Sequence, residues 1–200
     1  TGLKIIRKRG EVMNQAAAKH PGKMYAILGV EADILEKLIE QVPGYARIAN
    51  YNTYGQIVIS GETKAVDFLA EQAKTNGAKR AIPLNTSGAF HTDLMREAAE
   101  EFSNFLENIK LEEPKSKLLI NTTGTYYVSN IKKVMTDQIV NSVRFYQMVE
   151  QCLRDGYDTF IEIGPKTTLG GFVRKINKEA IVLNVEDNKS LQATLTIMGV

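Results

Sequence analysis

His91 is one of two residues whose type and position favour a role in catalysis or ligand binding. It stands three and four residues before Leu94 and Met95, at the start of a predicted helix and on its apolar stripe. A helix N-terminus disfavours a protonated imidazole, and a neutral imidazole suits a general base. The alternative is a hydrogen-bonded histidine of the core.

Arg9 is the second such residue. It lies about one helical turn from Ile6 and Met13, so its side chain could face inward. A buried guanidinium needs a carboxylate or phosphate partner, which makes Arg9 a candidate for binding an anionic group. Its neighbours Arg7 and Lys8 read as solvated charges.

Asn50 and Asn52 form a third candidate group. They are two residues apart on a predicted strand, so they project from the same face, and Gln56 follows just past the turn. Such a polar row could hold a ligand. The alternative is that these side chains cap the backbone of their own hairpin.

The sequence shows no nucleophile beside His91. No serine stands in a Gly-x-Ser-x-Gly elbow, and Cys152 falls on an apolar stripe with Phe145, Met148 and Val149. Residues 164–168 follow a strand but do not match the phosphate-binding P-loop. The chain also lacks the Gly-x-Gly-x-x-Gly motif and any cluster of His and Cys with metal-ligand spacing, so we expect no nucleotide cofactor and no metal.

The segment that positions Asn50 and Asn52 is predicted to be compact. Its pattern predicts strand 23–30, helix 33–42, strands 46–52 and 56–61, helix 63–77 and strand 80–85. This βαββαβ order is that of the ferredoxin-like fold, in which two helices cover one face of an antiparallel sheet.

The rest of the chain alternates longer helices with single strands. We predict helix 91–109, strand 117–121, helices 131–141 and 145–153, strand 159–163, helix 169–176 and strand 180–185. This alternation favours a parallel sheet covered by helices. A helix over 3–18, with an apolar stripe of Leu3, Ile6 and Met13, precedes the ferredoxin-like block. We therefore predict an α/β domain of residues 1–20 and 86–200, with residues 21–85 inserted into it.

Composition limits the possible partners. The 200 residues are 44% hydrophobic, and 25 Lys and Arg against 23 Asp and Glu give a net charge of +2. The charges are interleaved, which predicts no nucleic-acid partner and no polybasic membrane patch. No apolar run approaches the roughly 18 to 20 residues of a spanning helix, and no signal-peptide pattern is present. With a single cysteine, we expect a reducing, cytoplasmic compartment and no membrane partner.

Five groups of residues together resemble a known family. They are Lys8 to Met13, Asn50 to Asn52 with Gly55 to Gly61, Gly88 to Met95, Gln138 with Asn141 and Phe145, and Glu162 to Pro165. In this order they resemble the bacterial malonyl-CoA:acyl carrier protein transacylases, of the acyltransferase family of fatty acid and polyketide synthesis. The resemblance spans the whole chain. It implies an α/β-hydrolase-like large subdomain, here partial, with an inserted ferredoxin-like small subdomain.

The resemblance also implies a ping-pong acyl transfer without a cofactor. In that family a serine attacks malonyl-CoA, and the phosphopantetheine thiol of acyl carrier protein then collects the malonyl group. By resemblance, His91 is the base that takes the serine proton, and the backbone carbonyl of Gln138 orients the imidazole. Arg9 would pair with the malonyl carboxylate. Asn50 and Asn52 match polar residues near the active-site cleft.

Two further points follow from the resemblance. Phe90 resembles the bulky residue of malonyl-selective members, where it would crowd a 2-methyl branch. The serine elbow and much of the oxyanion hole are expected upstream of Thr1, so we expect the complete protein to be a transacylase and this chain alone to be inactive. The alternative is a nonenzymatic carrier-binding or structural remnant, which would have no need of His91 and Arg9 together.

Overall fold

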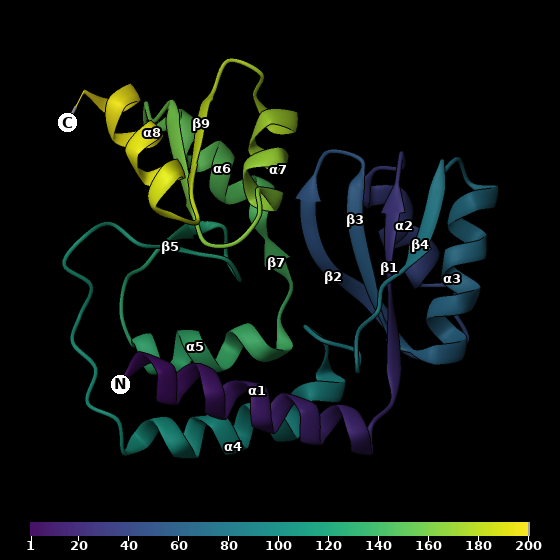
Figure 1. Cartoon of the computed structure of the whole chain (residues 1–200). Coiled ribbons are helices and arrows are strands. Elements are labelled where there is room, and N and C mark those ends of the chain that lie inside the picture. Colours follow the sequence, from purple (N-terminus) through teal and green to yellow (C-terminus); the bar gives the residue numbers. More distant parts are fainter. Residues whose placement is uncertain (200) are drawn as a thin grey trace.

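The computed structural model describes residues 1–199 (Figure 1). In chain order, its elements are α1 Gly2–Lys19, β1 Gly22–Leu28, α2 Ala32–Ile39, β2 Ala46–Thr53, β3 Gln56–Glu62, α3 Thr63–Thr75, β4 Arg80–Pro83, the 3₁₀ turn η1 Asp93–Met95, α4 Arg96–Glu107, β5 Leu119–Ile120, β6 Thr125–Tyr126, α5 Ile131–Val140, β7 Val143–Arg144, α6 Phe145–Arg154, β8 Thr159–Ile163, α7 Thr168–Ile176, β9 Ile181–Val185 and α8 Asn188–Met198. None of the helices in this range is long and apolar enough to cross a membrane.

The main sheet has the strand order β4-β1-β3-β2-β7. Strands β1 to β4 pair antiparallel, and β2 and β3 form a hairpin closed by Tyr54 and Gly55. Gly55 has a φ of 66°, a conformation that glycine adopts without steric cost. The predicted antiparallel pairing of strands 46–52 and 56–61, which are β2 and β3, is therefore confirmed.

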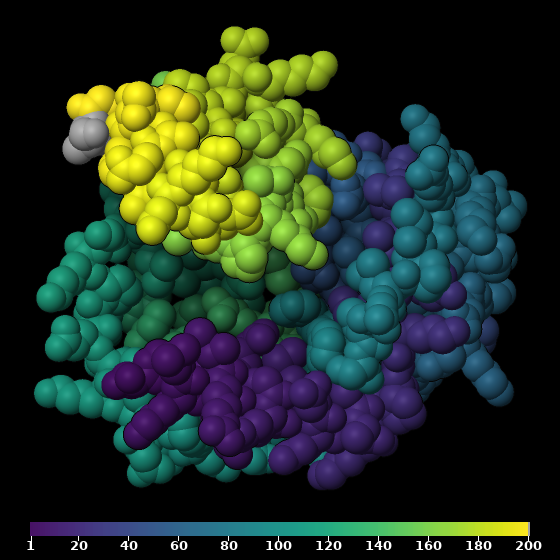
Figure 2. Space-filling model, viewed as in Figure 1, coloured from purple at the N-terminus to yellow at the C-terminus, as the bar shows by residue number. Residues whose placement is uncertain are grey.

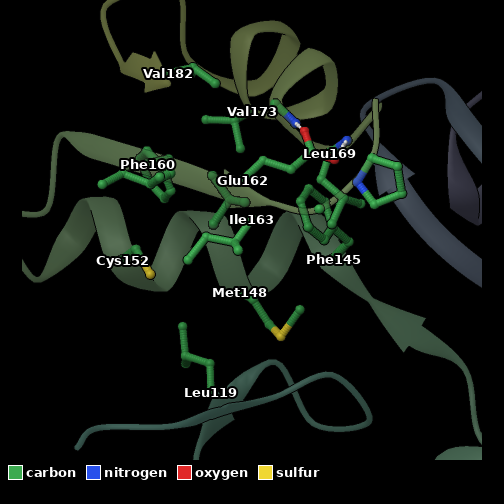
Figure 3. A pocket seen from close by; sticks show the side chains of 15 residues that line it. Leu119, Phe145, Met148, Cys152, Phe160, Glu162, Ile163, Leu169, Val173 and Val182 are labelled. Atoms are coloured by element: carbon green, nitrogen blue, oxygen red, sulfur yellow. Dashed lines mark hydrogen bonds between the residues drawn. The ribbon is translucent and has the colours of Figure 1, made fainter. Parts of the chain in front are cut away.

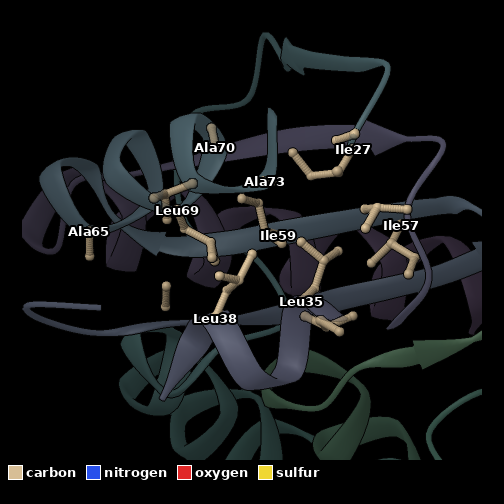
Figure 4. Close-up of a cluster of buried hydrophobic side chains, with 14 of the residues drawn as sticks. Ile27, Leu35, Leu38, Ile57, Ile59, Ala65, Leu69, Ala70 and Ala73 are labelled. Atoms are coloured by element: carbon tan, nitrogen blue, oxygen red, sulfur yellow. The ribbon is translucent and has the colours of Figure 1, made fainter. Parts of the chain in front are cut away.

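Helices α2 and α3 pack on one face of this sheet because both bury an apolar stripe there (Figure 4). Ile27, Ile57 and Ile59 of the strands meet Leu35 of α2 and Leu69 of α3, and each of these five side chains is less than 2% exposed. Burying a side chain of this size contributes about 1.5 to 3 kcal/mol, so this cluster is the main support of the sheet.

Strand β7 makes the sheet larger than predicted. It comes from the segment that follows α5, and it pairs parallel with β2 through Asn50 opposite Val143 and Tyr51 opposite Arg144. We expected an antiparallel sheet of the four strands between residues 23 and 85 that stands by itself, and this is wrong, because a fifth strand from outside this segment joins it in parallel. A two-residue strand carries no periodic pattern, so the sequence gives no sign of it.

A second core joins α1, α4 and α5. Val12, Met13 and Ala16 of α1 face Phe102 of α4 and Ile139 of α5, and all five are buried. The predicted stripe of α1 was wrong at its start, since Leu3 is 85% and Ile6 69% exposed while Ile5 is buried. The buried stripe therefore runs from Ile5 through Val12 and Ala16, and Arg9 lies on the same face of α1, four residues after Ile5 and three before Val12.

The expected parallel sheet is present only in part. Strands β8 and β9 pair parallel, but β5 pairs antiparallel with β6, a strand that the sequence did not predict. Within residues 1–199, these elements form two separate two-stranded sheets. The chain is nevertheless a mixed α/β structure, as predicted.

We expect Gly61→Ala to lower the free energy of unfolding by about 1 to 3 kcal/mol, as overpacking does. A Cβ at Gly61 would lie 2.2 Å from the carbonyl oxygen of Tyr45 and 2.7 Å from the Cα of Ala46, and both are backbone atoms. Gly10→Ala is the control, because it lies within α1 with no atom within 4 Å of the added Cβ. It should raise the free energy of unfolding by about 0.5 to 1 kcal/mol. Urea unfolding of both variants tests this, and equal midpoints would contradict it.

Candidate active site

His91 lies in a tight turn rather than in a helix. Its φ is 60°, a left-handed conformation that costs a non-glycine residue about 1 to 3 kcal/mol and is concentrated at functional sites. Thr92 follows as the N-cap of η1, and its buried hydroxyl donates to the carbonyl oxygen of Ala89 at 2.6 Å and accepts from the Leu94 N–H. The prediction that His91 begins the long helix is therefore wrong.

The imidazole is held by two backbone carbonyls. His91 Nδ1 lies 2.9 Å from the carbonyl oxygen of Gln138 and 3.1 Å from that of Asn141. Carbonyl oxygens only accept hydrogen bonds, so Nδ1 carries the proton and the lone pair of the neutral ring is on Nε2. The Gln138 contact agrees with the sequence interpretation, whereas the role of Asn141 was missed.

Asn141 could have been found from the end of α5. The last four carbonyls of a helix lack intrahelical partners, and Gln138 and Asn141 lie on either side of the last helical residue, Val140. A donor placed at this end can therefore meet both carbonyls at once. Asn141 also folds its side-chain amide back to the carbonyl of Asp137 at 2.9 Å, which fixes its own backbone.

The pKa of His91 is lowered from its ordinary value of 6.5. Burial is the main cause, and the positive charges of Arg9 and Arg47 act in the same direction, while the hydrogen bonds to Gln138 and Asn141 act against it. We had attributed a neutral imidazole to a helix N-terminus. The structure instead attributes it to desolvation and two nearby cations.

Arg9 is half-buried on α1, and burial lowers the pKa of its guanidinium. Its neighbours Arg7 and Lys8 pair with Glu11 and Glu101. Across residues 1–199, Arg9 itself forms no ion pair. A half-buried guanidinium that acts on a nearby imidazole and lacks an anion is suited to bind a small carboxylate.

Asn50 and Asn52 are half-buried on β2, and the register of β2 with β3 shifts between Tyr51 and Thr53, at Asn52. The register places Asn50 opposite Val58, on the face that also carries Met24 and Ala49. Phe90 packs against this same face and also against the α1–α4–α5 core. Asn50 therefore lies on the face of the sheet against which Phe90, the residue before His91, packs. Gln56 lies apart from Asn50 and Asn52, where its Oε1 accepts from Lys175 of α7 at 2.8 Å.

Comparison with known proteins decides the family. The acyl transferase domain model matches residues 1–194. The chain belongs to the acyl transferase domain family.

Its relatives are similar over almost the whole of this acyl transferase chain. Malonyl CoA-acyl carrier protein transacylase of Bacillus subtilis is 37% identical over 195 residues, which are 95% of this chain and 62% of that protein. The crystal structure of malonyl CoA-acyl carrier protein transacylase from Clostridium perfringens superposes with a TM-score of 0.95 at 40% identity, over 99% of this chain and 64% of that one.

A third similar structure contains a partner. It shows a type II PKS acyl-carrier protein in complex with its malonyl-transacylase, with a TM-score of 0.92 at 30% identity, over 97% of this chain and 64% of that one. The chain thus spans less than two thirds of the length of each of these three relatives.

The backbone donors around Gly164–Thr168 are engaged in part by carboxylates of the chain itself. Glu162 accepts from the backbone N–H of Leu169 at 3.1 Å and of Gly170 at 2.7 Å, so a carboxylate of the chain itself occupies the start of α7. The Lys166 N–H similarly donates to Glu186. Three backbone donors that a phosphate could meet, those of Lys166, Leu169 and Gly170, are therefore already satisfied.

Cys152 lines an apolar cavity of about 520 Å³ between α6, β8 and α7 (Figure 3). Burial raises the pKa of its thiol, which disfavours the thiolate that a nucleophile needs. Neither His91 nor Arg9 lines this cavity.

A hollow of the surface lies elsewhere. Figure 2 shows it between α1 and the C-terminal part of the chain, drawn in yellow-green and yellow. Over residues 1–199, no group of three or more His, Cys, Asp or Glu residues could hold a metal ion.

We expect His91 to titrate below pH 6.5, because burial and two cations disfavour its charged form. As the pH falls, the imidazole of the unfolded chain is protonated at a higher pH than the imidazole of the folded chain. The contribution of His91 to stability is therefore complete above about pH 6.5 and is lost as the pH falls toward its native pKa.

NMR titration of the histidine ring protons measures this pKa, and His20→Asn assigns the other histidine. Urea unfolding between pH 5 and 7 should show a steeper fall in stability for the wild type than for His91→Asn. A His91 pKa at or above 6.5 would contradict the expectation.

Proposed function

We propose that the complete protein transfers a malonyl group from coenzyme A to the phosphopantetheine thiol of acyl carrier protein. The observation that carries this proposal is the combination of His91, which is oriented through Nδ1 with Nε2 free, and Arg9, a half-buried cation without an anion among residues 1–199. The relatives named as malonyl CoA-acyl carrier protein transacylases support the choice of acyl group and acceptor.

His91 would act as the general base for a serine nucleophile. We propose that this serine belongs to the part of the relatives' length that the present chain does not span. His91 Nε2 takes the serine proton while the serine oxygen bonds the thioester carbon. When the carbon–sulfur bond breaks, the imidazolium returns this proton to the coenzyme A thiolate. The second half runs in reverse, with the carrier thiol attacking the acyl-serine.

The two carbonyls have a role in both halves of this reaction. When Nε2 is protonated, the ring is an imidazolium, and its Nδ1–H becomes a stronger donor to Gln138 and Asn141. The carbonyls therefore stabilise the charged intermediate state and keep Nε2 aimed in one direction. In a hydrolase triad a carboxylate has this role.

Arg9 would bind the malonyl carboxylate. A guanidinium offers two parallel N–H donors to the two oxygens of a carboxylate, and partial burial strengthens this pair relative to water. Because Arg9 has no carboxylate partner among the described residues, substrate binding need not break an existing ion pair.

Phe90, Asn50 and Asn52 would shape the cleft. Phe90 packs against two cores at once, so its ring is held from both sides and would exclude a 2-methyl branch on the acyl chain. Asn50 and Asn52 are half-buried on β2, and their amide groups could bind polar parts of the substrate. We further propose that the reaction takes place in the cytoplasm, which the single unpaired cysteine supports.

Arg9→Ala in the complete protein should lower malonyl transfer by roughly 30- to 1,000-fold. Loss of a charge-assisted pair in a closed site costs on the order of 2 to 4 kcal/mol, at about 1.4 kcal/mol per tenfold. Acetyl transfer should stay within a few-fold, because an acetyl group has no carboxylate to lose. Arg9→Lys should recover part of the loss. Steady-state rates with both thioesters measure the ratio, and equal losses in a folded variant would make Arg9 structural.

Incubation with radiolabelled malonyl-CoA tests where the nucleophile lies. We expect no covalent label on the 200-residue chain, because it holds no serine in a Gly-x-Ser-x-Gly elbow. The complete protein should take up one label, which His91→Ala should slow strongly. Stoichiometric labelling of the chain alone would place the nucleophile within it. An unlabelled complete protein that still binds acyl carrier protein would favour the nonenzymatic alternative.

A further inference from the structure

Arg47 on β2 reaches across to the end of α5. Its Nη1 donates to the carbonyl oxygen of Val140 at 3.1 Å, and its Nη2 lies 3.2 Å from the hydroxyl oxygen of Ser142. Val140 is the last residue of α5, so its carbonyl has no partner within the helix. One guanidinium therefore binds both sides of the turn that follows α5.

This turn is the one that holds His91. Asn141, whose carbonyl accepts from His91 Nδ1, lies between the two residues that Arg47 binds. The Ser142 hydroxyl is buried and donates to the carbonyl oxygen of Ile48 at 2.6 Å. Immediately after it, Val143 pairs with Asn50 in the sheet. The segment 140–143 is thus bound from β2 at three residues, Val140, Ser142 and Val143, while the carbonyl of Asn141 faces the imidazole.

The two hydrogen bonds from Arg47 to Val140 and Ser142, here called the clamp, suit arginine in particular. Its planar fork offers parallel donors to two acceptors, whereas a lysine ammonium is a single point charge. Arg47 is also a cation that acts on His91, together with Arg9 of α1. Within residues 1–199, Arg47 has no ion-pair partner, and its hydrogen bonds go to neutral oxygens.

We propose that Arg47 is a positioning residue for the general base: by binding Val140 and Ser142 it fixes the carbonyl of Asn141, and with it the orientation of the His91 ring. This inference rests on the proposed role of His91. It differs from a purely structural role, in which Arg47 would only stabilise the contact between the sheet and α5.

The deciding measurement is the tautomer of His91, read from the ring nitrogen shifts of the ¹⁵N-labelled chain at a pH well above 6.5. In the wild type, we expect the proton on Nδ1, since two carbonyls accept from it. Arg47→Met should shift a substantial fraction of the ring to the Nε2–H tautomer, and Arg47→Lys should shift less. Arg80→Met is the matched control, because Arg80 is an exposed arginine of the same sheet, and it should leave the tautomer unchanged.

Ser142→Ala keeps the experiment decisive if Arg47→Met does not fold. It removes one arm of the clamp without removing a charge, and it should also lower the Nδ1–H fraction. An unchanged tautomer in folded Arg47→Met, or in Ser142→Ala where Arg47→Met is unfolded, would overturn the proposal.

Kinetics of the complete protein provide an independent readout. Misplacement of a catalytic group by about 1 Å costs up to about 100-fold, so Arg47→Met should lower kcat by about 10- to 100-fold with little change in KM for malonyl-CoA. A raised KM at unchanged kcat would overturn the proposal in favour of substrate binding. If the wild-type complete protein transfers no malonyl group, the proposed function fails, and the tautomer experiment still decides the role of Arg47.

Discussion

The structure of the site depends on one contact, the hydrogen bond from His91 Nδ1 to the carbonyls of Gln138 and Asn141. These oxygens are available only because α5 ends at Val140. The end of α5 is in turn fixed on two sides. Ile139 is buried in the core with α1 and α4, and the turn after Val140 is bound to β2. The orientation of the His91 imidazole therefore depends on the packing of α5 against α1 and α4 and on its contact with the main sheet.

His91 Nδ1 donates to neutral carbonyls rather than to a carboxylate, and this has an electrostatic consequence. A carboxylate at this place would favour the imidazolium and would raise the pKa of His91, whereas neutral carbonyls leave burial and the cations Arg9 and Arg47 to lower it. A carboxylate would also attract Arg9 into an ion pair inside the protein. With neutral acceptors, one site can hold both a base that stays unprotonated near neutral pH and a guanidinium that is free for a substrate anion.

Much of the fold could be predicted because its signals are local. The βαββαβ order was predicted correctly, since each strand and helix between Gly22 and Pro83 shows its own apolar period. Strand β7 and the turn at His91 could not be predicted, because a two-residue strand has no period and a positive φ at a histidine has no sequence signal. The division into residues 1–20 with 86–200 and residues 21–85 stays a prediction.

The candidate site could be predicted less completely than the fold. His91 and Arg9 were candidates from their residue types and positions, and the Gln138 carbonyl was proposed from a resemblance. The structure brings His91 and this carbonyl within hydrogen-bond distance. The roles of Arg47 and Asn141 were not found, because they involve backbone oxygens, whose positions depend on how separate elements pack. A sequence reveals side-chain chemistry more readily than it reveals which carbonyl a helix end leaves free.

An irregularity in β2 explains how Arg47 and Asn50 can lie on the same side of the sheet. In a regular strand, Arg47 and Asn50 would face opposite sides, because their separation is odd. The pairing of β2 with β3 shifts between Ile48 and Asn50, and Ile48 and Tyr51 accordingly both point into the core beneath α2 and α3. The extra residue at this bulge reverses the alternation, so Arg47 and Asn50 share the face against which Phe90 packs. Arg47, proposed to fix the turn after α5, and Asn50, proposed to meet the substrate, thus share one face of the sheet because the strand is irregular.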